Sequence, residues 1–140
     1  MTPRSSIRAV SLALTALTLV WITALALAET DGTPVDYEAE IQPIFNVHCY
    51  SCHLRGAEPG GLALEPGVSY DELVNVPSEQ SELLRVAPGD PEASYLLHKL
   101  RGTQVEVGGS GNAMPQGGGT LSEEAIALIE AWITSLPPAE

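Results

Sequence analysis

The chain contains only two cysteines, and both belong to the run Cys49-Tyr50-Ser51-Cys52-His53, here called the 49–53 motif. Residues three and four apart lie on one face of a helical turn, so we expect both thiols and the His53 imidazole to point the same way. Cys-x-x-Cys-His is the pattern through which a haem is attached covalently. We therefore expect thioethers from Cys49 and Cys52 to hold one haem, with His53 as an axial ligand to its iron.

The residues alone leave two other roles open for a Cys-x-x-Cys pair. One is a redox disulfide of the thioredoxin type, but this needs a strand-helix-strand setting, and the run before Cys49 does not have a strand pattern. The other is half of a structural zinc site, which needs two more ligands at short spacing. The remaining histidines are His48, beside the motif, and His98, far downstream. The spacing favours haem over both alternatives.

Residues 1–28 have the pattern of a secretory signal peptide. Arg4 and Arg8 precede a largely apolar, uncharged stretch over residues 9–28, which ends in an Ala-Leu-Ala sequence at Ala28. The small residues at this junction favour cleavage after Ala28. The stretch is also long enough to cross a bilayer, so an uncleaved membrane anchor is the second choice. Haem is attached to this kind of motif outside the cytoplasm, so we expect a periplasmic protein.

The charge of the exported part limits its partners. All 18 acidic residues lie at or after Glu29, whereas two of the six basic residues, Arg4 and Arg8, lie before it. This excess of negative charge argues against nucleic acid, which requires clustered Lys and Arg. It also argues against an anionic membrane surface, so membrane contact is expected only if the signal stays uncleaved. The charge favours solubility, with steering towards a basic partner as the functional alternative.

Residues 36–137 are expected to form one small all-α domain after a disordered lead over residues 29–35. Caps and apolar spacing predict short helices, and no convincing period-two strand is present. The predicted helices run from about Glu40 into the 49–53 motif, from a Ser69–Glu72 capping box to about Val76, from Asp90-Pro91 to just before Gly102, and from Ser122 to Leu136 with Ile126, Ile129, Trp132 and Ile133 on one face. Large side chains are few, so a buried haem would be the centre of the core.

The second axial ligand is expected to be Met114. It is the only methionine besides Met1, and it lies in a glycine-rich loop with no apolar periodicity. A lone methionine usually fills a core, but packing gives this one little reason to be there. A thioether is a ligand that haem iron accepts. His98 is the rival, although its apolar helical surroundings are more typical of a partly buried helix residue. His48 is expected to be a surface residue.

Further stretches of the chain carry a family resemblance. They are Val35-Asp36-Tyr37, Ile41-Gln42-Pro43-Ile44, Gly60-Gly61-Leu62-Ala63-Leu64, the run from Val86 to Ser94, Met114-Pro115, Leu121-Ser122 and Trp132-Ile133. Together with the 49–53 motif they resemble the class I c-type cytochromes, most closely the planctomycete-type cytochrome c-like domains. The resemblance implies a small cytochrome c fold of about four short helices wrapped around one covalently attached haem c, with His53 and Met114 as axial ligands. It also implies an aromatic contact between the first and last helices through Phe45 and Trp132, and it favours the loop 60–66 as the one that orients His53 through its second nitrogen.

These expectations point to a carrier of single electrons rather than an enzyme. With both axial positions filled, no substrate reaches the iron. The partners would be redox proteins, a donor dehydrogenase and an acceptor oxidase or reductase. Two alternatives stay open: a haem-bearing subunit of a larger periplasmic oxidoreductase, and an open-site haem protein that binds a small gas or peroxide because Met114 does not hold the iron.

Overall fold

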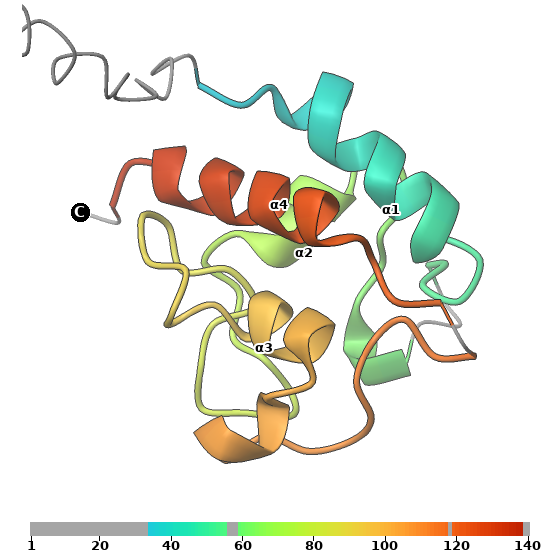
Figure 1. The fold of residues 1–140 in the computed structure, drawn as a ribbon, viewed down its shortest axis with the longest axis vertical. Helices are drawn as coiled ribbons and strands as arrows, with labels where there is room; N and C mark the ends of the chain where they lie inside the picture. The colour runs from blue at the N-terminus through green and yellow to red at the C-terminus, as the bar shows by residue number, and fades with distance from the viewer. Residues whose placement is uncertain (1–33, 56–58, 118, 139–140) are drawn as a thin grey trace, which may run out of the picture. The chain divides into compact units, whose positions relative to one another are not determined.

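The computed structural model describes residues 34–55, 59–117 and 119–138 (Figure 1). Within these ranges the regular structure is helical, with backbone pairing only in isolated bridges such as that between Val74 and Val86, so the all-α prediction is confirmed. The predicted signal over residues 1–28, and the predicted lead up to residue 33, lie outside the described residues. No helix in the described part has the length and apolar character that a membrane crossing requires.

Four α-helices and three further helical turns follow one another along the described chain. In order they are the π-helical turn η1 (Tyr37–Ile41), α1 (Gln42–His48), the 3₁₀ turn η2 (Pro59–Gly61), α2 (Ser69–Leu73), α3 (Tyr95–Arg101), the 3₁₀ turn η3 (Gln104–Val107) and α4 (Glu123–Ser135). Helix α4 contacts both η1 and α3, as Figure 1 shows. It therefore joins the beginning of the described chain to its middle.

The first helical segment starts earlier than predicted. Asp36 caps it, because the Asp36 Oδ1 atom accepts a hydrogen bond from the Ala39 N–H at 3.0 Å. An aspartate in this position satisfies one of the N–H groups that a helix start leaves without a partner. Pro43 lies in the first turn of α1, as predicted, where a missing N–H is tolerated. The segment ends with His48, and Cys49 is its C-terminal cap.

The predicted capping box at Ser69 is wrong. Val68 occupies the cap position of α2, and Ser69 is the first helical residue, with a fully buried side chain. The Ser69 hydroxyl accepts a hydrogen bond from the Tyr37 hydroxyl at 2.7 Å and donates one to the Gln42 side chain. These distant partners take the hydroxyl that the capping box would have used. The helix also ends earlier than predicted, at Leu73, because the next residue adopts extended backbone.

The predicted start of α3 is also wrong, whereas its end is confirmed. Asp90 closes a turn of its own, in which its Oδ1 atom accepts a hydrogen bond from the Ala93 N–H at 3.1 Å. An aspartate side chain can stabilise such a local turn as well as a helix, and the helix begins only at Tyr95. At the other end Gly102 adopts the left-handed conformation, with φ of 73°, and terminates the helix.

Helix α4 follows its prediction closely. The Ser122 side chain caps it by accepting a hydrogen bond from the Ala125 N–H at 3.2 Å. All four apolar residues predicted for one face are buried: Ile126, Ile129, Trp132 and Ile133. Strong local signals, a serine cap and apolar residues at helical spacing, thus place this element in the core.

The aromatic contact between the first and last helical segments includes Tyr37. Its ring centre lies 6.3 Å from that of Phe45 and 5.0 Å from that of Trp132. Phe45 and Trp132, the pair implied by the resemblance, are both buried in the same core cluster. The Tyr70 ring completes the group, with its centre 5.1 Å from that of Tyr37. Tyr37 therefore links η1, α1 and α4 in a way that the sequence did not indicate.

Tyr37 also gives the fold a dependence on alkaline pH. Burial raises the pKa of Tyr37 to about 12 from the usual 10.0, and the hydrogen bond to Ser69 opposes this rise without cancelling it. The folded protein therefore binds this proton more tightly than the unfolded chain, so its stability falls as the pH rises from 10 to 12. We expect Tyr37→Phe to cost about 1 kcal/mol at neutral pH through the lost hydrogen bond. We also expect it to make the alkaline fall in stability shallower.

Denaturant unfolding of the wild type and of Tyr37→Phe, at neutral pH and across the alkaline range, measures both effects. The control is Tyr50→Phe, because Tyr50 is exposed. A Tyr37→Phe variant whose stability falls as steeply with pH as that of the wild type would contradict the assignment.

Candidate functional site

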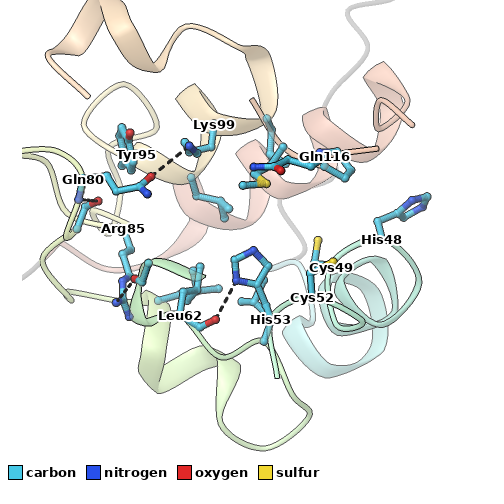
Figure 2. A pocket seen from close by; sticks show the side chains of 18 of the residues that line it. His48, Cys49, Cys52, His53, Leu62, Gln80, Arg85, Tyr95, Lys99 and Gln116 are labelled. Carbon is cyan, nitrogen blue, oxygen red and sulfur yellow. Dashed lines mark hydrogen bonds between the residues drawn. The ribbon is translucent and has the colours of Figure 1, made fainter. Parts of the chain in front are cut away.

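The 49–53 motif forms one hydrogen-bonded turn directly after α1. The N–H groups of Cys52 and His53 both donate to the carbonyl oxygen of Cys49, at 3.1 and 3.0 Å. Both thiols are free, and Cys49 is half-buried while Cys52 is exposed. Burial raises the pKa of the Cys49 thiol to about 11, and the neighbouring Cys52 adds to this rise. Figure 2 shows Cys49, Cys52 and His53 next to one another, as the spacing predicts.

The His53 ring is held by a backbone carbonyl. Its Nδ1 atom lies 2.9 Å from the carbonyl oxygen of Leu62 (Figure 2). A carbonyl oxygen can only accept, so this contact places the hydrogen on Nδ1 and leaves the Nε2 lone pair available to a metal ion. The Leu64 N–H also donates to the His53 carbonyl oxygen at 2.8 Å. The prediction that the loop 60–66 orients His53 is therefore confirmed.

Arg85 holds the loop 60–66 in place through hydrogen bonds to its backbone. Its Nη2 atom donates to the carbonyl oxygens of Gly60 and Gly61, at 3.2 and 2.9 Å. Its Nη1 atom donates to the carbonyl oxygen of Glu72 at 2.9 Å and to the Glu72 carboxylate at 3.1 Å. The guanidinium group is buried, and its positive charge is paired with the Glu72 carboxylate. Sequence reasoning missed this residue, because its partners lie on two distant segments.

A cavity of about 270 Å³ lies beside the motif. Cys49, Cys52 and His53 line it together with Met114, so the structure brings all four predicted site residues to one cavity. Much of the remaining wall consists of leucines: Leu62, Leu64, Leu73, Leu96 and Leu100. Its volume is close to the lower end of the range for small-molecule pockets, about 300 to 1,000 Å³. The apolar wall suits a flat, largely apolar cofactor.

Met114 is anchored to the site through its backbone. Its N–H donates to the carbonyl oxygen of Lys99 on α3 at 2.8 Å. The side chain is half-buried and packs against the core cluster. A loop that the sequence shows only as glycine-rich is thus tied to a helix at the residue predicted to bind the iron.

The two other histidines have different surroundings. The His98 Nδ1 atom lies 2.9 Å from the Thr103 hydroxyl, and its Nε2 atom lies 3.0 Å from the Glu92 carbonyl oxygen. Both ring nitrogens are therefore engaged away from the cavity. His48 also lines the cavity, but it is exposed, and Figure 2 shows its ring directed away from His53. In the described ranges, no three His, Cys, Asp or Glu side chains gather as they would around a metal ion such as zinc.

The cavity also has a polar side. Lys99, Gln80 and Tyr95 line it, and Figure 2 shows them on the side away from Cys49 and Cys52. The Lys99 ammonium group donates to the Gln80 side-chain oxygen, and burial lowers the pKa of Lys99. The cavity wall is thus leucine-rich, with hydrogen-bonding side chains on the side away from Cys49 and Cys52.

No protein-family model, no curated protein and no solved structure matches this chain. The function is therefore inferred from the residues of the cavity and from their geometry.

Proposed function

We propose that the protein is a periplasmic monohaem c-type cytochrome that carries single electrons between redox partner proteins. The observation that supports this most strongly is the contact of His53 Nδ1 with Leu62, which leaves Nε2 available beside two free thiols. An imidazole prepared in this way, next to Cys49 and Cys52 on the wall of a leucine-rich cavity, is what a covalently attached haem requires.

The described residues fit this cofactor in their donor chemistry. Thioethers from Cys49 and Cys52 would attach the haem, and His53 and Met114 would be the ligands to its iron. These four residues line one cavity, and imidazole with thioether is a ligand pair that haem iron uses. In the proposed holoprotein the four helices wrap around the cofactor.

The haem would supply a one-electron iron couple, and the residues of this chain would adjust it. The Leu62 carbonyl raises the basicity of His53 by accepting from its Nδ1–H. The leucines would exclude water from the bound haem and give the site a low dielectric constant, which would disfavour the extra positive charge of ferric iron. With His53 and Met114 both holding the iron, no substrate would reach it. We therefore propose a carrier and not an enzyme, with an acidic surface suited to basic partners.

The decisive variant for the axial ligand is Met114→Leu. Expressed with a haem-attachment system, the wild type is expected to show the weak long-wavelength charge-transfer band of a methionine–ferric iron bond. The variant is expected to lose this band and to have a lower reduction potential, because it lacks the thioether. It should keep its covalent haem, since both cysteines are intact. Leucine preserves the apolar volume, so the change reports ligation rather than packing.

Visible spectra of the oxidised and reduced forms provide the measurement, and His98→Ala provides the control. We expect His98→Ala to keep the charge-transfer band, because the His98 ring is engaged by Thr103 and Glu92. A Met114→Leu variant that still shows the band would contradict methionine ligation. A wild-type spectrum of the high-spin type that responds to carbon monoxide would indicate an open gas-binding site.

A further inference from the structure

The polar side of the cavity contains a buried ammonium group with neutral partners. Lys99 is only 8 % exposed. Its Nζ atom donates to the Gln80 side-chain oxygen and to the Ser110 carbonyl oxygen, both at 3.2 Å. It also lies 5.9 Å from the centre of the Tyr95 ring. The ion pairs among the described residues involve Arg85 and Arg101, and none involves Lys99.

Arg85, which lines the same cavity, shows the contrast. It is as deeply buried as Lys99, but the Glu72 carboxylate lies 3.1 Å from its Nη1 atom. The charge of Arg85 is thus balanced by this chain, and that of Lys99 is not balanced by any described residue. A buried charge without an opposite charge destabilises a folded protein. An anionic group beside Lys99 would offset this cost.

Hydrogen-bond donors also outnumber acceptors around Lys99. An ammonium group has three N–H donors, and two of those of Lys99 have protein acceptors. Gln80 accepts from Lys99 through its Oε1 atom, so its Nε2 group is a further donor on the cavity wall. A positive charge with surplus donors is suited to a carboxylate.

We infer that Lys99 and Gln80 bind a carboxylate, and that in the proposed cytochrome this carboxylate is a propionate of the haem. The inference rests on the proposed function. A haem attached at one edge through its vinyl groups presents its two propionates at the opposite edge. Lys99 and Gln80 lie on the side of the cavity away from Cys49 and Cys52 (Figure 2), so the polar side chains and the attachment site are arranged in the same order. Lys99 and Gln80 are then positioning residues that orient the cofactor in the cavity.

The test uses the holoprotein and the variants Lys99→Gln and Gln80→Ala. Infrared difference spectra between the oxidised and reduced forms report the carboxylate stretch of the propionates, and a redox titration reports the potential. We expect both variants to shift the carboxylate band. We expect Lys99→Gln, which also removes a positive charge, to favour the ferric form about tenfold, which is about 59 mV for a one-electron couple.

The matched control is Arg101→Gln. It removes the same charge from the same helix, but Arg101 is exposed and paired with Glu92 and Glu130. We expect its carboxylate band to stay in place and its potential to change much less. A band that stays in place in both Lys99→Gln and Gln80→Ala, with haem attached, would overturn the propionate contact and leave the proposed function intact.

Two further results separate the possible sources of the carboxylate. A wild-type potential that shifts with added acetate, and does so only when Lys99 is present, would assign the site to a dissolved carboxylate and overturn the propionate contact. If the wild type carries no covalent haem, the proposed function fails, and the thermal stability of the full chain is measured with and without acetate. Stabilisation by acetate that is lost in Lys99→Gln would support a carboxylate site, and no stabilisation would overturn it.

Discussion

Replacing both Cys49 and Cys52 by alanine is expected to abolish covalent haem and to leave most of the protein unfolded. These are the only thiols of the chain, so no thioether can form. Without the proposed haem, Leu62 and Leu96 would lose their cover, because the chain itself leaves these two cavity leucines half-buried. Full burial of one such side chain contributes about 1.5 to 3 kcal/mol, whereas a small domain has a total stability of about 5 to 15 kcal/mol. The loss of cover over these two leucines, together with the other contacts of the haem, would therefore remove a large part of that stability.

A haem stain on a denaturing gel and the far-ultraviolet circular dichroism of the purified protein measure these two effects. Ser51→Ala is the matched control, because Ser51 lies between the cysteines, is exposed, and has no thiol that could form a thioether. We expect this control to keep its haem and its helical signal. A double cysteine variant with the thermal stability of the wild type would show that the fold does not depend on a bound haem.

Trp132→Ala is expected to lower the free energy of unfolding of the protein by about 3 to 5 kcal/mol. Trp132 is 1 % exposed and its ring packs against those of Tyr37 and Tyr70. Alanine would leave a void where η1, α2 and α4 meet. Native packing density does not tolerate such a void without cost.

Urea unfolding measures this change, and Thr134→Ala on the exposed face of the same helix is its control. We expect the control to lie within about 0.5 kcal/mol of the wild type, as is usual for surface positions. A loss below about 1 kcal/mol for Trp132→Ala would mean that α4 is not the central packing element.

Local signals in the sequence predicted those parts of the fold that depend on local chemistry. The cap of α4 at Ser122 and the left-handed stop at Gly102 involve neighbours in the chain, and both were predicted correctly. Ser69 and Asp90 have the same capping chemistry but were assigned to the wrong structures. The hydroxyl of Ser69 is taken by Tyr37 and Gln42, which lie far away in sequence, and Asp90 closes its own turn.

The candidate site divides in the same way. The grouping of Cys49, Cys52 and His53 was predicted from their spacing, because the three residues share one turn. Arg85 and Lys99 gave no signal in the sequence, since an isolated basic residue is usually a surface residue. Their importance follows from burial and from partners on other segments. The donor side chains of such a site are thus easier to recognise in a sequence than the residues that support them.

Intact-mass spectrometry tests the central claim most directly, namely that a haem is attached covalently at Cys49 and Cys52. The protein would be exported in a host with a haem-attachment system, purified, denatured and weighed, and its free thiols counted. We expect the mass of the polypeptide plus one haem, with no free thiol. The mass of the polypeptide alone, with both thiols free, would contradict the claim.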